Sequence, residues 1–444
     1  MSLIGRTLAD LALDLKAGRT TGRSLVESTL EAIDRDGRAF TLVTAESARA
    51  TADAWDSLRA RGVAAPPFAG VPVSVKDLFD VAGQTTGAGS LTLQNAAPAA
   101  DDAPVIARLR AAGLVIIGRT QMSEFAFTGL GLNPHRPQPP NPRDASRVPG
   151  GSSGGAAASV ALGQAAAAVG TDTGGSVRIP AAFCGLVGFK PTQRRITRRG
   201  AFPLSFSLDS IGPIGESTAC CRTLDSILAD AEPREAPPIP VAGLRLGAPR
   251  QYFTDGMAPE VAVALERAFA ALTAAGARII TFDFPELERI ATINARGTLS
   301  SAEVFAHHRR LGLLDSRKRI DPNVWARIAP GESMSAADYV DLITARAALI
   351  EDANRRTAPF DAVIAPTTPI LAPKIADVAT AEAFAQQNLL ALRNTSVANL
   401  LDRCSISLPM GTDEGPPAGL MLIGETGGDA RLLRIAEAIE TLVA

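Results

Sequence analysis

Two glycine-rich segments that carry serines constrain this chain more than any other feature of its sequence. The first is Gly150-Gly-Ser-Ser-Gly-Gly155, and the second is Gly170-Thr-Asp-Thr-Gly-Gly-Ser-Val-Arg-Ile-Pro180. Glycine concentrates where the backbone approaches a ligand or adopts conformations that other residues avoid. In the second segment Gly174 and Gly175 precede Ser176, and a short helix is expected directly after it. Several backbone N–H groups then surround one hydroxyl, which is the geometry of an oxyanion hole.

Either segment alone also fits a glycine-rich connection or a phosphate-binding loop, because short motifs match by chance. The chain contains no G-x-x-x-x-G-K-[ST], and no G-x-G-x-x-G follows an expected strand. Residues 150–154 match the G-x-S-x-G elbow of α/β-hydrolases, which would make Ser152 the nucleophile and His307 or His308 its base. That elbow sits on a strand-to-helix turn, whereas residues 141–147 do not have the pattern of a strand.

A serine hydroxyl needs a base before it can act as a nucleophile. Lysine is scarce here, with five lysines among 44 basic residues, and Lys76 ends the apolar run 71–75, which is expected to be a strand. Desolvation at that place favours the neutral amine, which accepts a proton near neutral pH. Taken alone, Lys76 also fits a surface lysine whose stem lies on apolar atoms. The lysine becomes a candidate base only beside the two serine segments.

Taken together, these segments closely resemble the amidase signature family. The matching segments share the order and spacing of the family motifs and are 71–77, 141–142, 150–155, 170–180, 188–192, 408–411 and 419–424. The resemblance thus spans nearly the whole chain. It implies an α/β fold over residues 1–444 in one domain, with a central mixed β-sheet surrounded by α-helices.

The resemblance also implies a Ser–cisSer–Lys triad. Carried over residue by residue, Ser176 is the nucleophile, Ser152 the bridging serine and Lys76 the base. The family pattern places a cis peptide bond between Gly151 and Ser152, which aims the Ser152 hydroxyl between the other two side chains. We expect hydrogen-bond contacts on both sides of Ser152, as a proton relay requires.

Other positions take supporting roles by the same resemblance. The oxyanion hole falls on the N–H groups of Thr173, Gly174, Gly175 and Ser176. Asp172 and Arg178 match positions that hold this loop in shape. Ala126 and Phe127 match positions that line the acyl side of the site. Ser153 and Glu216 receive no role.

The reaction implied is cleavage of an amide-like carbon–nitrogen bond, of the amide, anilide, carbamate or urea type. It runs through an acyl-enzyme on Ser176, with Ser152 relaying protons to Lys76. One alternative is the A subunit of glutamyl-tRNA amidotransferase, a family member that releases ammonia from glutamine for a partner, although its resemblance outside the shared motifs is weak. A second is a catalytically silent binding protein on the same fold, against which the intact triad argues.

Composition excludes several other classes. The net charge of −2 lacks the basic footprint of a nucleic-acid-binding protein. No run reaches 18 apolar residues, and Asp10 interrupts the place where a signal peptide is apolar. Four scattered cysteines and three histidines show no metal-ligand spacing. We therefore expect a cytoplasmic protein with a small-molecule amide-like substrate and without cofactor, metal, nucleic acid or membrane. A homodimer also fits the sequence.

The rest of the chain alternates between helical and strand patterns, as an α/β fold requires. Helices are expected at 8–15, after Thr21 or Ser24, and at 105–112, 156–162 and 259–275. Strands are expected at 71–77, 113–118, 277–284, 361–365 and 419–423. Residues 129–155 are expected to form an ordered loop, and 232–240 a linker. Segments 290–345 and 366–400 match no motif and are expected to shape the substrate pocket.

Overall fold

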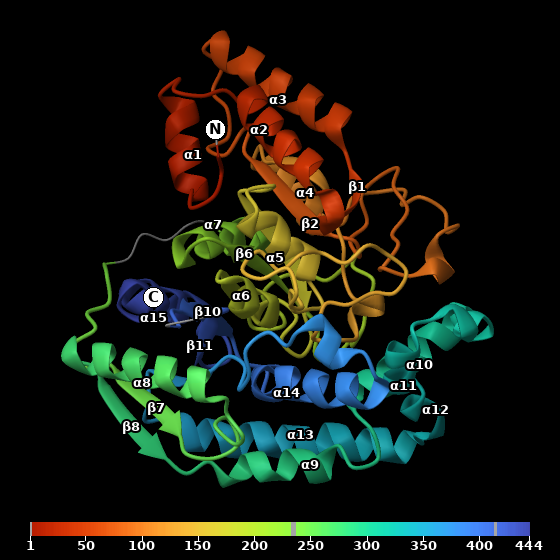
Figure 1. Ribbon diagram of the computed structural model, residues 1–444, viewed down its shortest axis with the longest axis vertical. Coiled ribbons are helices and arrows are strands. Elements are labelled where there is room, and N and C mark those ends of the chain that lie inside the picture. The colour runs from red at the N-terminus through yellow and green to blue at the C-terminus, as the bar shows by residue number, and fades with distance from the viewer. Residues whose placement is uncertain (1, 232–236, 413–414) are drawn as a thin grey trace.

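An eleven-stranded mixed β-sheet runs through the computed structural model, which describes residues 2–231, 237–412 and 415–444 (Figure 1). In spatial order the strands are β1 (Phe40–Val43), β3 (Val115–Thr120), β2 (Pro72–Lys76), β4 (Ala167–Asp172), β6 (Ser210–Gly215), β5 (Val187–Lys190), β10 (Ser405–Met410), β11 (Ala418–Ile423), β9 (Ala362–Pro366), β7 (Arg245–Pro249) and β8 (Arg278–Phe282). Strand β2 runs parallel to β3 and β4, and β7 runs parallel to β8 and β9. The remaining pairs are antiparallel. The expected α/β class with a central mixed sheet is confirmed.

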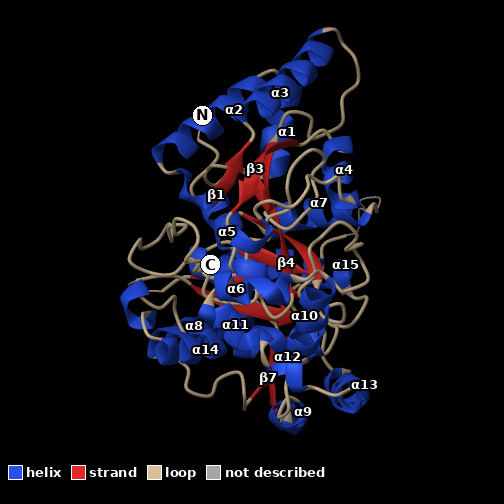
Figure 2. Cartoon of the chain, turned by 90° about the vertical axis from the view of Figure 1, so that its right-hand side faces the viewer, coloured by secondary structure: helices blue, strands red, loops and turns tan. Residues whose placement is uncertain are grey.

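Helices pack on either side of the sheet, which Figure 2 shows in the middle of the molecule. The α-helices are α1 (Leu8–Lys16), α2 (Gly22–Arg35), α3 (Ala45–Ala60), α4 (Pro104–Ala111), α5 (Gly154–Ala161), α6 (Arg178–Cys184), α7 (Thr218–Ala229), α8 (Pro259–Ala274), α9 (Arg289–Ile293), α10 (Leu299–Arg310), α11 (Pro322–Ile328), α12 (Pro330–Ser333), α13 (Ala336–Thr357), α14 (Ala381–Leu400) and α15 (Asp429–Val443). Short 3-10 helices occupy Gly37–Ala39, Leu91–Leu93, Glu124–Ala126, Pro285–Glu288, Leu313–Arg319 and Ile375–Val378.

Local sequence explains where several elements begin. A capping box between Thr7 and Asp10 starts α1. The Thr21 hydroxyl accepts the backbone N–H of Ser24 at 3.0 Å, so Thr21 rather than Ser24 is the N-cap of α2. Strand β2 is buried along its whole length because parallel neighbours flank it on both edges and helices cover its faces.

Two expected elements begin two residues away from their expected starts. The strand expected at 113–118 is Val115–Thr120, because Gly113 adopts a positive φ of 85° and turns the chain after α4. Helix α5 begins at Gly154 rather than 156, with Ser153 at its N-cap. Residues 129–153 contain no helix or strand, as expected for a loop. Of the expected linker 232–240, residues 232–236 lie outside the described residues, and strands on both sides of it join the same sheet.

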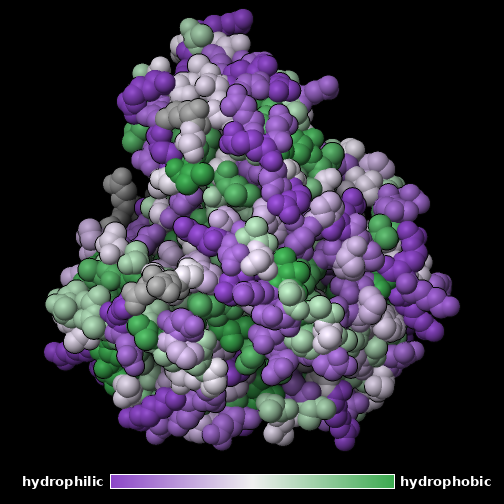
Figure 3. Space-filling model, viewed as in Figure 1, coloured by the Kyte–Doolittle hydropathy of each residue, from purple (hydrophilic) through white to green (hydrophobic). Residues whose placement is uncertain are grey.

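Within 2–231, 237–412 and 415–444, none of the helices combines the length and the apolar character that crossing a bilayer demands. On the face seen in Figure 3, apolar side chains are scattered in small groups among polar ones.

Candidate active site

Lys76 lies at the end of β2, where the parallel neighbour β4 brings Thr171 beside it. Its Nζ donates hydrogen bonds to Ser152 Oγ at 2.7 Å and to Thr171 Oγ1 at 3.0 Å. Burial of the whole side chain disfavours the ammonium form and lowers the pKa of Lys76 to about 7, against the raising effect of the Asp172 and Asp209 carboxylates. A large share of the amine is therefore neutral near pH 7 and able to accept a proton.

The loop that carries Ser152 is pinned against the loop that carries Ser176. The Gly151–Ser152 peptide bond is cis, which confirms that expectation. The Gly151 N–H donates to the Gly129 carbonyl at 2.8 Å, and the Ser153 N–H donates to the Ser176 carbonyl at 3.2 Å. No hydrogen bond joins the Ser152 and Ser176 hydroxyls in the described part of the chain. Of the two contacts expected for Ser152, the one with lysine is formed in this structure.

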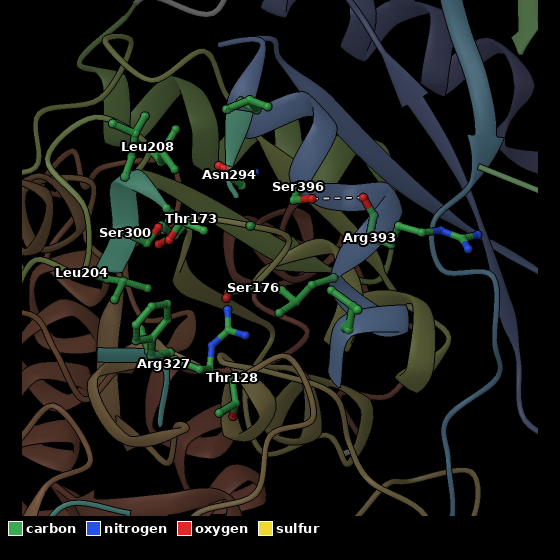
Figure 4. Close-up of a pocket in the computed structure, with 18 of the residues that line it drawn as sticks. Thr128, Thr173, Ser176, Leu204, Leu208, Asn294, Ser300, Arg327, Arg393 and Ser396 are labelled. Atoms are coloured by element: carbon green, nitrogen blue, oxygen red, sulfur yellow. Dashed lines mark hydrogen bonds between the residues drawn. The ribbon is translucent and has the colours of Figure 1, made fainter. Parts of the chain in front are cut away.

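Ser176 lies in the loop between β4 and α6 and lines a cavity of about 270 Å³ (Figure 4). The backbone N–H groups of Thr173, Gly174 and Ser176 donate to no acceptor among the residues described. The Gly175 N–H instead donates to Asp172 Oδ1 at 2.8 Å. Three of the four expected oxyanion donors are thus available. Gly175 differs from the expectation because a carboxylate already occupies its N–H.

The Asp172 carboxylate organises this turn. It accepts the Val177 N–H at 3.1 Å and forms an ion pair with Arg178 at 2.9 Å, with both side chains of the pair fully buried. Asn399 donates to Asp172 Oδ1 at 2.9 Å and accepts from Arg178 Nη2 at 2.7 Å. Burial raises the pKa of Asp172, but the charge and hydrogen bonds of Arg178 outweigh it and lower the pKa to about 2. The carboxylate therefore stays ionised and fixes the backbone around Ser176.

A second buried carboxylate, Asp209, holds the other side of the loop. The Thr173 hydroxyl donates to Asp209 Oδ1 at 2.6 Å, and the N–H groups of Leu204 and Ser205 donate to Oδ2 at 3.0 Å each. Burial raises the pKa of Asp209 to about 6. Sequence reasoning missed this residue. Asp209 directly precedes the fully buried strand β6, which the sequence pattern did not predict, so no local signal pointed to this residue.

The two segments that match no family motif both contribute to the cavity. Six lining residues lie between Ile290 and Arg327, and five lie between Leu389 and Leu400. Ala126 and Phe127 also line it, where the resemblance places the acyl side. Arg327, on α11, also lines the cavity, and the sequence patterns did not single it out. The sequence showed only that no acidic residue lies three or four positions away on its helix to pair with it.

The family resemblance assigns no role to Ser153 or Glu216, and both form hydrogen bonds within the protein. The Ser153 hydroxyl donates to the Thr171 carbonyl at 3.4 Å, and its backbone holds the Ser176 segment as described above. Glu216 follows β6, and its carboxylate accepts a hydrogen bond from the backbone of Gly5.

The nucleophile elbow does not fit the observed geometry. His307 and His308 lie on α10 against aromatic rings, with centroids 5.1 Å from Phe202 and 4.3 Å from Phe125 respectively, and neither hydrogen bonds to Ser152. Burial lowers the pKa of both imidazoles to about 4. A loop rather than a strand precedes α5. In the described ranges, no group of three or more His, Cys, Asp or Glu side chains is placed to hold a metal ion.

The chain is similar to known proteins over most of its length. The family model named Amidase matches residues 24–433. A 2-amino-5-chloromuconic acid deaminase from Comamonas testosteroni is 38% identical over 409 residues, covering 89% of this chain and 86% of that protein. A crystal structure of an amidase superposes with a TM-score of 0.89 at 33% identity, covering 98% of this chain and 99% of the other.

The A subunit of the glutamyl-tRNA(Gln) amidotransferase from Roseiflexus castenholzii is 35% identical over 471 residues. That match covers 98% of this chain and 95% of that protein. The expectation that resemblance to such proteins is weak outside the shared motifs is therefore wrong.

Proposed function

The chain belongs to the amidase family and hydrolyses amide-like carbon–nitrogen bonds, and on that premise we propose that Ser176 is its nucleophile, Ser152 its proton relay and Lys76 its base. The observation that carries this proposal is the 2.7 Å contact between the buried Lys76 amine and the Ser152 hydroxyl. A lysine whose pKa is about 7 has the neutral form that a general base requires.

The proposed reaction begins when Ser176 Oγ attacks the substrate carbonyl carbon. The Ser176 proton passes to Ser152, whose own proton passes to the neutral amine of Lys76. For this transfer the Ser176 hydroxyl turns toward Ser152 as substrate binds. The tetrahedral oxyanion accepts hydrogen bonds from the free N–H groups of Thr173, Gly174 and Ser176.

Collapse of that intermediate breaks the carbon–nitrogen bond and leaves an ester on Ser176. The proton held by Lys76 returns through Ser152 to the departing nitrogen, which needs it to leave. Water then attacks the ester with the same relay as base, and the acid product departs. In this scheme Asp172, Arg178 and Gly175 position the turn, because the carboxylate fixes the Gly175 N–H and the guanidinium together.

An acyl-enzyme trap tests the proposal. Purified protein is mixed with an activated aryl ester, quenched in acid within milliseconds to seconds and digested for peptide mass spectrometry. Trypsin leaves Ser152 and Ser176 on one peptide, 148–178, so fragmentation of that peptide locates the adduct, and we expect it on Ser176. In Ser152→Ala the adduct should persist longer, because the relay that activates water for breakdown of the ester is missing. An acyl mass on Ser152, or burst-free turnover without any adduct, contradicts the assignment.

A second candidate function is that of a glutaminase-type member of an amidotransferase complex, favoured by the match over 98% of the chain to such a protein. A glutaminase-type subunit should release ammonia from glutamine, and the rate of release should increase when its partner is present. A silent binding protein would release ammonia from neither glutamine nor a simple aryl amide. Comparing these two substrates on the purified chain distinguishes an amidase, a glutaminase-type subunit and a silent binding protein.

We propose that residues 1–444 form one domain, since strands before and after 232–240 share one sheet. A cytoplasmic location is supported by four buried cysteines that are all free, including the adjacent pair Cys220 and Cys221. The substrate is proposed to be a small molecule, in keeping with the size of the cavity at Ser176. The homodimer stays a prediction, which sedimentation of the purified protein tests.

A further inference from the structure

One wall of the pocket carries an arginine that has no acidic partner among the described residues. Arg327, on α11, lines the same cavity as Ser176, and Figure 4 shows its guanidinium directed toward that serine. It forms no hydrogen bond or ion pair with the residues described, and its Nε is buried without an acceptor. Its guanidinium lies over the Phe127 ring, whose centre is 4.6 Å from the guanidinium carbon.

The rest of the cavity does not neutralise this charge. Among the described residues that line it, there is no Asp and no Glu. Arg327 remains charged at neutral pH, since burial alone lowers its pKa only to about 10 and no carboxylate contributes. A buried guanidinium without a partner is costly, so such a group normally meets an anion.

The second arginine of the pocket is arranged differently. Arg393, on α14, donates through Nε to Asn394 Oδ1 at 3.2 Å and through Nη2 to the Phe253 carbonyl at 3.3 Å. Figure 4 shows its guanidinium directed away from Ser176. Arg393 therefore directs its hydrogen bonds to the protein, whereas those of Arg327 remain for a ligand.

We infer that Arg327 binds a carboxylate on the acyl part of the substrate, and that the substrate carries no ammonium group beside it. This inference rests on the proposed function. Contact with Phe127 places the arginine on the acyl side, and its planar fork matches a carboxylate with two parallel hydrogen bonds. An amino acid amide such as glutamine would bring an ammonium into a cavity whose described lining offers it no acid. The substrate class is accordingly the short monoamide of a dicarboxylic acid.

Three amides of matched length test this selection. Glutaramate is glutamine without its α-amino group, and pentanamide lacks both charged groups. Hydrolysis of glutaramate breaks its carbon–nitrogen bond, adds water across it and yields glutarate and ammonium, which a coupled assay measures. We expect the wild-type kcat/KM to be highest for glutaramate, about tenfold or more above the other two.

Variants locate the origin of the preference. Arg327→Gln should lower the ratio of kcat/KM for glutaramate to that for pentanamide by about 10- to 150-fold, the range for a hydrogen bond to a charged group. Arg327→Lys should keep part of the preference because the charge remains. Arg393→Gln removes the same charge from the other wall and should change the ratio by no more than about threefold, since its guanidinium does not face the substrate.

The outcomes are distinguishable. If the wild type hydrolyses none of these amides nor an aryl anilide, the proposed function itself fails. If it hydrolyses pentanamide as well as glutaramate, or if Arg327→Gln leaves their ratio unchanged, only the carboxylate inference is overturned. Preference for glutamine over glutaramate overturns it as well. The comparison of substrates on the wild type requires no variant to fold.

Discussion

Lys76 Nζ lies 2.7 Å from Ser152 Oγ, and both side chains are inaccessible to solvent. The second partner of the amine is another hydroxyl, Thr171 Oγ1 at 3.0 Å, rather than a carboxylate. A carboxylate in contact would stabilise the ammonium form, whereas hydroxyls solvate either form. The charges of Asp172 and Asp209 raise the pKa of Lys76 through space, but this effect is smaller than the lowering caused by burial. This arrangement suits a base that must be neutral before each turnover.

The two serines are expected to differ in what their removal does. Ser176→Ala should abolish hydrolysis, because no ester can form, while the far-ultraviolet circular dichroism stays that of the wild type. Ser152→Ala should be severely impaired yet keep more residual activity than Ser176→Ala, because Ser152 relays a proton and forms no bond to the substrate. Steady-state rates of both variants check this. Near-normal rates in Ser176→Ala beside a dead Ser152→Ala would restore the elbow assignment.

The pH dependence of kcat/KM should follow the ionisation of Lys76. Because the base is active when neutral and its pKa is about 7, activity should rise through about pH 7 and level off above it. Lys76→Arg should be nearly inactive, since arginine has no accessible neutral form.

Lys190 provides the matched control for that profile. It is also fully buried, with a pKa lowered by burial to about 8, and its Nζ donates to the Pro191 carbonyl at 2.7 Å. Lys190→Met should keep an activity midpoint near pH 7. Loss of that midpoint in Lys190→Met, or full activity in Lys76→Arg, would end the lysine-base assignment.

Lys76 should also make stability depend on pH. Its pKa falls from 10.5 when exposed to about 7 in the folded protein, so between these values the unfolded state binds more protons. Stability of the wild type should therefore rise with pH relative to Lys76→Met, by about 1.4 kcal/mol per pH unit at most. Urea unfolding of both proteins at pH 7 and pH 9 measures this. A difference that does not change with pH means that Lys76 has an ordinary pKa when folded.

Local motifs made much of the site predictable. The cis bond before Ser152, the burial of Lys76 and the placement of Ala126 and Phe127 beside Ser176 all follow from segments whose residues are close in sequence or match a known pattern. Elements with clear periodicity and capping, such as α1 and β2, were placed within one or two residues for the same reason.

Other features depend on contacts between distant segments. The hydrogen bond from the Gly175 N–H to Asp172 is an exception, because the two residues are only three apart in sequence and the bond could still be assigned only from the folded turn. Asp209 meets Thr173 because β4 and β6 pair antiparallel, which no local pattern revealed. The sequence does not distinguish Arg327 from the other arginines, and only the packing of α11 places its side chain in the cavity. Its role depends on which acids are absent there, and a sequence does not show that.

Two neighbouring glycines in the nucleophile turn, Gly174 and Gly175, differ in the room they leave for a side chain. Gly175 has a φ of 130°, a conformation that side chains rarely adopt, and a Cβ built there would lie 2.5 Å from Thr395 Cβ. It would also displace the Thr395 hydroxyl, which donates to the Gly174 carbonyl at 2.6 Å. Gly175→Ala should therefore lower the free energy of unfolding by about 1–3 kcal/mol or more and misplace Ser176.

Gly174→Ala is the matched control for this change. A Cβ at Gly174 meets nothing closer than Leu392 Cδ2 at 3.4 Å, an ordinary contact, and its φ is not positive. We expect its unfolding free energy to stay within about 1 kcal/mol of the wild type. The double variant Gly175→Ala/Thr395→Ala removes the contact with the Thr395 hydroxyl, but it keeps the Cβ of residue 395 and the strained φ. Its stability should recover only in part, and equal losses in Gly174→Ala and Gly175→Ala would contradict the geometry assigned to this turn.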